Sequence, residues 1–160
     1  MQDGLTEQLR TFYETYRREM FLYALSITGC RPSAEDAVHN AFGTVLRKGR
    51  APRELRPFMF RCVRNAALDE RRFVAREAQK TSLFAKLHDE TAPEARCLEA
   101  EVEEILELLS NDERECVLLK IYGGLTFKEI AQVRGVPQGT AASWYWRGLA
   151  RVRAHLEAHT

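Results

Sequence analysis

The sequence predicts an all-α protein made of two small helical domains joined by an acidic linker. Apolar residues recur at helical spacing along nearly the whole chain, and no stretch alternates with period two for long. The length of 160 residues leaves room for one ordinary domain or two small ones. Charge falls into blocks, with an acidic block between two basic ones. We therefore expect domains over residues 1–78 and 101–160, and a linker over residues 79–100.

The first domain is expected to begin with two helices. An apolar stripe over residues 5–27 predicts the first helix, which Gly29 and Pro32 should end. Ser33 is predicted to open the second helix, with Asp36 closing a capping box. Its expected buried face consists of small and apolar side chains, namely Ala37, Val38, Ala41, Phe42 and Val45.

A loop and a third helix should complete this domain. Residues 47–57 contain one Gly, two Pro and several cations, which predicts a basic loop. The third helix is expected from about Phe58. Its expected inward residues are Met59, Cys62, Val63 and Ala66.

The second domain carries the spacing of a helix-turn-helix. Ser110 and Thr126 each precede a Glu by three residues, which predicts a capping box at the start of two helices. A helix-turn-helix needs a small residue where its helices touch and a turn-tolerant residue four places on, and Ala131 and Gly135 fit these positions. Ala141 fits the inward position of the second helix, which we expect over residues 138–156.

The inner face of this recognition helix is predicted to be Ala141, Tyr145, Leu149, Val152 and Leu156. Four polar residues remain available to base edges and phosphates, namely Gln138, Thr140, Ser143 and Arg147. Trp144 and Trp146 cannot both be buried with Tyr145, because neighbours on a helix diverge by about 100°. We expect Trp144 to pack in the core and Trp146 to touch DNA or protein.

The net charge of +1 conceals strong segregation. Residues 43–80 have a net charge of +7, residues 88–115 of −9, and residues 116–160 of +4. Two basic blocks suggest two lobes that each meet a polyanion. The alternative is that the blocks are solvated helix faces, and charge alone does not decide between them.

The composition argues against several other classes of protein. No run approaches 18 apolar residues, and the N-terminus lacks a signal-peptide pattern, so a cytoplasmic protein is expected. The four cysteines show no zinc-ligand spacing and are expected to be reduced thiols, with no metal or other cofactor. No nucleophile elbow, phosphate-binding Gly-rich loop or paired acid and base is present, so an enzyme is not expected.

Several segments together resemble the bacterial sigma-70 family of RNA polymerase sigma factors, of the extracytoplasmic-function type. The segments LSNDERECV (109–117), GLTFKEIA (124–131), GVPQGT (135–140) and RGL (147–149) resemble region 4. AEDAVHNAF (34–42) resembles the core-binding helix of region 2, and FMFRCVRNAALD (58–69) resembles its promoter-melting helix. The matches cover roughly residues 10–75 and 105–157, in the order and spacing of the family.

The resemblance implies a transcription initiation factor that binds core RNA polymerase, melts the −10 element through region 2 and reads the −35 element through region 4. Contact with the polymerase clamp helices is implied for Glu35, Asp36, His39, Asn40 and Phe42. Capture of unstacked −10 bases is implied for Arg50, Arg53, Arg61, Arg64, Asn65, Arg71 and Arg72. Contact with duplex is implied for Lys128, Gln138, Thr140, Ser143, Trp146 and Arg147. An anti-sigma factor is an implied partner, and the acidic linker is expected to enter the basic channel of the polymerase.

The chain departs from the family pattern at three places. His39-Asn40 replaces a Gln followed by an acidic residue, and Ser110 replaces a usual Pro. Ala142 and Trp144 replace a Lys and an Arg, which should reduce the salt slope of DNA binding by about two units if both cations contacted phosphates. Two alternatives therefore stay open at this point: a stand-alone helix-turn-helix regulator, and a degenerate sigma-like protein that binds polymerase or a regulator without initiating transcription.

Overall fold

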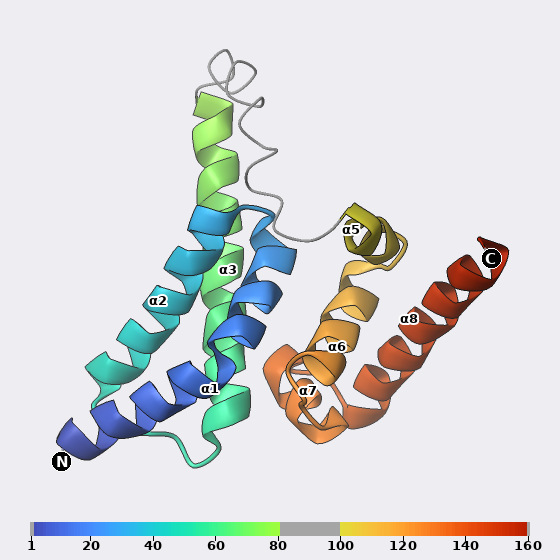
Figure 1. Ribbon diagram of the computed structural model, residues 1–160. Coiled ribbons are helices and arrows are strands. Elements are labelled where there is room, and N and C mark those ends of the chain that lie inside the picture. Colours follow the sequence, from blue (N-terminus) through green and yellow to red (C-terminus); the bar gives the residue numbers. More distant parts are fainter. Residues whose placement is uncertain (1, 81–99, 160) are drawn as a thin grey trace. The chain divides into compact units, whose positions relative to one another are not determined.

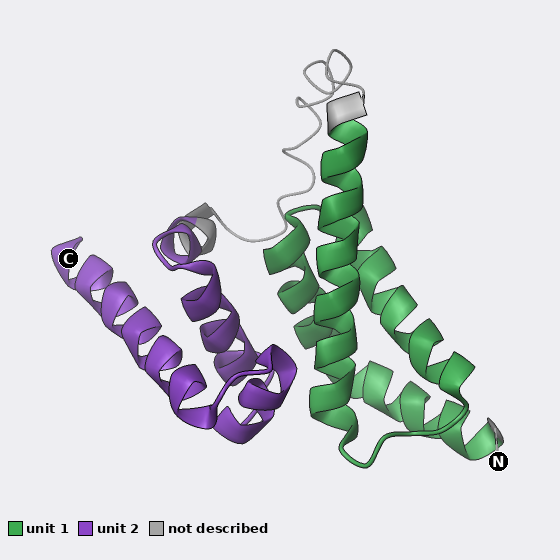
Figure 2. Cartoon of the chain, turned by 180° about the vertical axis from the view of Figure 1, so that it is seen from behind, with its two compact units in different colours: residues 1–97 green, residues 98–160 purple. Residues whose placement is uncertain are grey.

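The computed structural model describes residues 2–80 and 100–159, and every regular element in these ranges is a helix (Figure 1). The all-α class is therefore confirmed. The chain divides into two compact units, Met1–Cys97 and Leu98–Thr160 (Figure 2), which we call unit 1 and unit 2. The predicted linker lies almost wholly outside the described residues.

The described part of unit 1, residues 2–80, contains α1 (Gln2–Thr28), α2 (Arg31–Lys48) and α3 (Leu55–Lys80), each packed against the other two. The core is made of large apolar side chains from α1 and α3, against which α2 presents mainly Ala and Val. Phe60 of α3 is fully buried, and its ring centroid lies 6.1 Å from Tyr23 and 6.3 Å from Tyr16 of α1. Residues 71–78 of α3 are all exposed, so this helix extends past the part that its neighbours cover (Figure 1).

The start of α2 corrects one prediction. The helix begins at Arg31, with Cys30 as its N-cap, and Ser33 is a buried residue inside the first turn. Pro32 explains the earlier start, because its ring fixes a helical φ angle and its missing N–H is not needed there. The predicted capping box of Ser33 and Asp36 is therefore wrong, and α2 has no side-chain cap.

The basic loop is shorter than predicted, because both flanking helices extend into residues 47–57. α2 continues to Lys48 and ends at Gly49, whose φ of 74° is a left-handed conformation that suits Gly. α3 begins at Leu55, three residues before the expected start, and its first turn accommodates Pro57. Phe60 is fully buried although it was not predicted to be, whereas Cys62, Ala66 and Phe42 are only partly buried.

Unit 2 consists of α5 (Ala100–Glu107), α6 (Asn111–Ile121), α7 (Phe127–Arg134) and α8 (Gln138–Ala158). Its core includes Leu106, Leu109, Val117 and Leu118, against which Tyr145 and Val152 of α8 pack. Helices α6 and α8 approach closely at Gly148, where an added Cβ would lie 2.8 Å from Val117 Cγ2. The predicted inward position of Leu156 is wrong: this side chain is 49% exposed, because it lies past the residues of α8 that reach the cluster.

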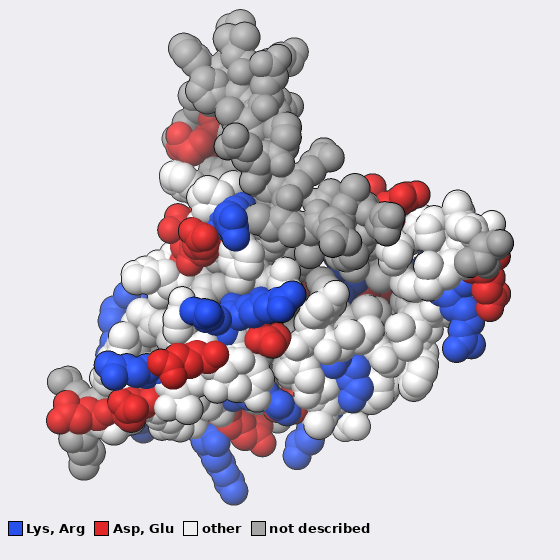
Figure 3. Space-filling model, in the orientation of Figure 1, with Lys and Arg blue, Asp and Glu red and all other residues white. Residues whose placement is uncertain are grey.

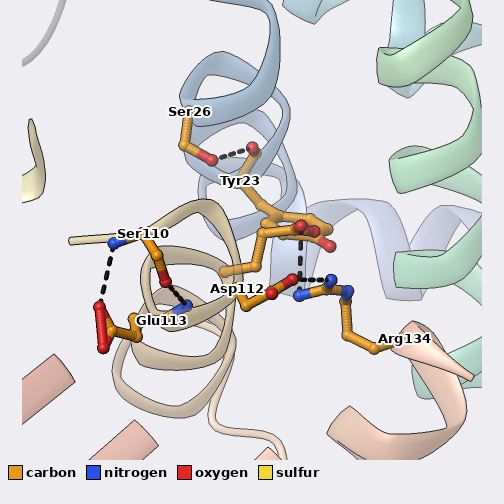
Figure 4. Close-up of polar contacts among 7 residues, drawn as sticks. Tyr23, Ser26, Ser110, Asp112, Glu113 and Arg134 are labelled. Carbon is orange, nitrogen blue, oxygen red and sulfur yellow. Dashed lines mark hydrogen bonds and ion pairs between the residues drawn. The ribbon is translucent and has the colours of Figure 1, made fainter. Parts of the chain in front are cut away.

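The helix starts and turns of unit 2 agree with the sequence analysis. Ser110 and Glu113 form a reciprocal capping box at the start of α6 (Figure 4), and Thr126 and Glu129 form another at α7. Gly135 ends α7 with a φ of 65°, which is the turn residue that the helix-turn-helix needs.

Candidate functional site

Most of the predicted polymerase-binding residues lie on the outward face of α2. Glu35, Asp36, His39 and Asn40 are exposed, on the side of the helix opposite its buried Ala and Val residues. Phe42 instead turns toward α1, where its ring centroid lies 5.5 Å from Tyr13 in an edge-to-face contact. These contacts hold Phe42 half-buried at the border between core and surface.

A groove of about 1160 Å³ runs between α1 and α2. Its floor includes the apolar side chains of Leu9, Val38 and Phe42, and the α2 wall carries the predicted Glu35, Asp36 and His39. The α1 wall contributes cations that the sequence analysis did not single out, Arg10, Arg17 and Arg18. Figure 3 shows side chains of both signs beside one another on this part of unit 1. The groove therefore combines an apolar floor with cations on the α1 wall and charges of both signs on the α2 wall, where Arg31 lies 3.8 Å from Glu35.

The loop between α2 and α3 forms a second, smaller hollow in unit 1. This pocket of about 400 Å³ is lined by Lys48, Arg50, Ala51, Pro52, Arg53 and Phe58. The Lys48 ammonium lies 5.0 Å from the centroid of the Phe58 ring, a cation–π contact. The structure thus brings the two predicted loop arginines together with an aromatic ring and a third cation. Lys48 and Phe58 were missed, although the basic run that ends at an aromatic residue was a usable signal.

The remaining predicted residues of unit 1 follow two adjacent strips along α3. Arg61, Asn65 and Arg72 are exposed and share one strip, and Arg64 and Arg71 lie roughly 80° around the helix. Arg72 also donates a hydrogen bond to Asp69 at 3.2 Å, but both side chains are exposed and the pair contributes little. Next to them, burial raises the pKa of the half-buried Cys62 thiol. This part of α3 presents cations beside a thiol that stays protonated.

In unit 2 the predicted residues cluster around the start of α8. Gln138, Arg147 and Trp146 are exposed, as is Lys128 on α7, whereas Thr140 and Ser143 are half-buried. Arg147 donates a hydrogen bond to the Ser143 hydroxyl at 3.0 Å. Pro137 is the N-cap of α8 and supplies no side-chain cap, so the first N–H groups of the helix are open to an anion.

Trp144 has a structural partner that the sequence analysis did not foresee. Its ring lies 5.1 Å from the guanidinium carbon of Arg134, at the end of α7. Arg134 also forms ion pairs with two carboxylates of α6, at 2.5 Å from Asp112 (Figure 4) and 3.3 Å from Glu115. The Arg134 side chain is only 8% exposed. Trp144 is partly buried and, through Arg134, connects α8 to α7 and α6.

A second arginine of unit 2 is also used internally. Arg151 of α8 lies 3.2 Å from the carboxylate of the buried Glu113. The same carboxylate accepts the Ser110 N–H in the capping box. Glu113 therefore caps the start of α6 and also holds α8 against α6 through its ion pair with Arg151.

The structure describes three of the four cysteines. Cys30, Cys62 and Cys116 are free, and burial raises the pKa of Cys116 to about 11. Cys97 lies outside the described residues. Within the described ranges no group of His, Cys, Asp and Glu could hold a metal ion. No helix in those ranges is long and apolar enough to cross a membrane.

A helical bundle with a basic loop, followed by a helix-turn-helix, defines the class of two-unit all-α proteins to which this chain belongs. Two family models match the chain: sigma-70 region 2 over residues 12–77, and sigma-70 region 4 over residues 99–152. The chain therefore belongs to the sigma-70 family, and the resemblance to its extracytoplasmic-function type is confirmed. It is a transcription initiation factor, a role that involves RNA polymerase and promoter DNA.

A solved structure supports the same fold. The sigma factor RpoE, in complex with the anti-sigma factor NepR from Bartonella quintana, is similar with a TM-score of 0.71. The two chains are 19% identical, and the match covers 94% of this chain and 98% of that one. At this identity the likeness shows the fold alone. No curated protein matches the chain.

Proposed function

We propose that the two units divide the work of promoter recognition. Unit 1 binds core RNA polymerase through the outward face of α2 and holds unpaired −10 bases at the 49–54 loop and along α3. Unit 2 binds the −35 element as duplex, with α8 in the major groove. The chain acts in the cytoplasm with the polymerase and catalyses no reaction itself.

The pocket at the loop is the observation that carries this proposal. Single-stranded nucleic acid is held by aromatic rings on which bases stack and by cations that contact the phosphates. Phe58 supplies a ring, and Lys48, Arg50 and Arg53 supply cations around a hollow of about 400 Å³. The predicted strip of Arg61, Asn65 and Arg72 continues along α3 from the same end of the helix. An unstacked base and its flanking phosphates match this chemistry.

Run-off transcription with core RNA polymerase on a pool of genomic promoter fragments tests the proposal. Discrete start sites should appear only when the protein is added. The double variant Arg50→Gln, Arg53→Gln should still bind polymerase but lower the yield from those start sites, because it removes two of the three cations around the pocket and leaves the Phe58 ring in place. Arg76→Gln, an exposed cation elsewhere on α3, is the matched control.

Two results would contradict the proposal in different ways. Polymerase binding without any start site would favour a degenerate sigma-like protein. Equal transcript yields from the double variant and the control would show that the 49–54 loop does not hold unpaired −10 bases. Permanganate reactivity of unpaired thymines locates the defect, because a loss of base capture should reduce opening of the −10 element.

We also propose an anti-sigma factor as a partner of this chain. The support is the similar RpoE, whose structure contains the anti-sigma factor NepR. The groove between α1 and α2, with its apolar floor and charged walls, suits an amphipathic protein segment. Such a partner should suppress run-off transcription in proportion to its binding, and variants of the α1 wall should relieve that suppression.

A further inference from the structure

The outward face of α8 presents a defined stripe of four residues. Gly139, Ala142, Ser143 and Trp146 follow the spacing i, i+3, i+4, i+7 and therefore lie on one face. The opposite face packs into unit 2 through the buried Ala141 and Gly148 and through Val152. In homeodomains the recognition helix presents four positions at this same spacing to base edges in the major groove. The stripe is thus the part of α8 that would meet the bases.

The chemistry of the stripe is almost entirely apolar. Gly139 has no side chain, Ala142 offers one methyl group, and the Ser143 hydroxyl already accepts a hydrogen bond from Arg147 at 3.0 Å. Trp146 is 59% exposed and is the largest group on this face. Guanine and adenine are read by bidentate hydrogen bonds from Arg, Lys, Asn or Gln, and the stripe contains none of these. The group in the major groove that suits an apolar contact is the C5-methyl of thymine.

Trp146 is held in place before any ligand binds. Its ring contacts Tyr145 edge-to-face, with centroids 5.0 Å apart, and Tyr145 in turn contacts Phe127 at 5.3 Å. The Lys120 ammonium lies 4.7 Å from the centroid of the Phe127 ring, a cation–π contact. Tyr145 also packs against the buried cluster of unit 2. A large ring supported in this way loses little conformational freedom on binding.

We propose that Trp146, together with Ala142, reads thymine methyl groups in the upstream promoter duplex. Unit 2 then selects its site by apolar contact in the major groove, and Gln138 and Arg147 contribute at its flanks. This inference rests on the proposed function, in which α8 binds that duplex. The inference is that α8 prefers thymine at the base-pair positions that face Trp146.

Deoxyuridine substitution tests this proposal, because it removes only the methyl group. Holoenzyme made with the full chain first selects binders from promoter fragments with a randomised upstream segment. Each thymine of a selected duplex is then replaced in turn by deoxyuridine. At the position facing Trp146 the affinity of the holoenzyme should fall about four-fold, the factor that corresponds to ~0.8 kcal/mol for one buried methyl group.

The variant Trp146→Ala should bind the thymine duplex more weakly and show less than about a 1.5-fold further loss on the deoxyuridine duplex, because the methyl has lost its partner. Trp146→Phe should keep part of the deoxyuridine effect. Leu156→Ala is the matched control, since Leu156 is also an exposed apolar residue of α8, and it should behave like the original chain. Fluorescence of Trp144 reports whether unit 2 of the Trp146→Ala variant is folded.

Three outcomes overturn the inference while leaving the proposed function intact. The first is a deoxyuridine effect of the same size in the original chain and in Trp146→Ala. The second is no deoxyuridine effect at any position. The third is a loss of affinity of Trp146→Ala for core polymerase without DNA, which would make Trp146 a protein contact. Failure to select any upstream sequence, by contrast, would contradict the proposed function itself.

Discussion

The two units of this sigma factor hold their helices together by different means. The core of unit 1 is apolar and aromatic, centred on fully buried side chains such as Met20, Tyr23 and Phe60. Unit 2 adds charge to its interior. Among the described residues, the buried carboxylates Glu113 and Glu115 both belong to it, and each pairs with an arginine from another helix.

The difference shows that a count of basic residues overstates the charge available for a ligand. In unit 1 the cations of the loop and of α3 are mostly exposed. In unit 2, Arg134 and Arg151 form internal ion pairs, and Lys120 lies against an aromatic ring. The basic block at the C-terminus therefore offers fewer cations to DNA than its net charge of +4 suggests. We therefore expect unit 2 to bind DNA only weakly through phosphate contacts and to depend more on contacts with the bases.

The variant Phe60→Ala should produce the largest effect and should act on unit 1. Removing this fully buried ring leaves a cavity beside Tyr16 and Tyr23 and should lower the free energy of unfolding by about 3–5 kcal/mol. Hydrogen exchange of the backbone amides in α1–α3 measures this loss in the free energy of unfolding. Phe73→Ala is the control, because Phe73 is 56% exposed. A similar loss in both variants would argue against an aromatic core.

The variant Arg134→Met tests the charged interior of unit 2. It leaves Glu115 and Asp112 without their cation. We expect the free energy of unfolding to fall by about 3 kcal/mol, because the carboxylate that remains is buried without a compensating charge. Both tryptophans lie in unit 2, so urea titration followed by tryptophan fluorescence measures its unfolding. Adding Glu115→Gln should restore part of the stability. Arg153→Met, at an exposed position, should change little.

The contrast between the units also explains which features the sequence could predict. Helix periodicity, the helix-turn-helix and both capping boxes of unit 2 depend on local spacing, and each was predicted. The start of α2 was missed because Pro32 competes with Ser33 as a start signal. The burial of Phe60 was missed because two adjacent positions, Met59 and Phe60, both turn inward between two helices.

Long-range polar pairs were beyond the reach of periodicity. Arg134 and Asp112 are 22 residues apart, and Arg151 and Glu113 are 38 apart. Nothing in local spacing relates such residues, so Trp144 was assigned to the core without its partner Arg134. The roles of the exposed residues stay predictions, because exposure makes a side chain available without identifying its ligand.

The variant Thr126→Ala should have a smaller effect, confined to one helix start. The Thr126 hydroxyl accepts the N–H of Glu129 at 3.1 Å, and the Glu129 carboxylate accepts the N–H of Thr126 at 3.1 Å. Loss of one half of this capping box should cost about 1 kcal/mol in the fluorescence-detected unfolding of unit 2. Thr126→Ser keeps the hydroxyl and should retain most of the stability. An equal loss in both variants would assign the effect to the lost methyl group.

The smallest expected effect is the pH dependence that Cys116 gives to unit 2. This buried thiol has a pKa of about 11 in the folded chain against 9.0 for a free thiol, because burial disfavours the thiolate. Below about pH 8 the thiol is neutral in both states, so its contribution to stability is fully present. As the pH rises above 9 the unfolded chain releases the proton and the folded chain keeps it, so the free energy of unfolding falls. Between pH 8 and 9.5 the original chain should lose about 0.8 kcal/mol more than Cys116→Ala in fluorescence-detected urea titrations. Parallel pH profiles of the two chains would mean that the interior of unit 2 tolerates a thiolate beside Arg134, and that its charged cluster admits a further anion.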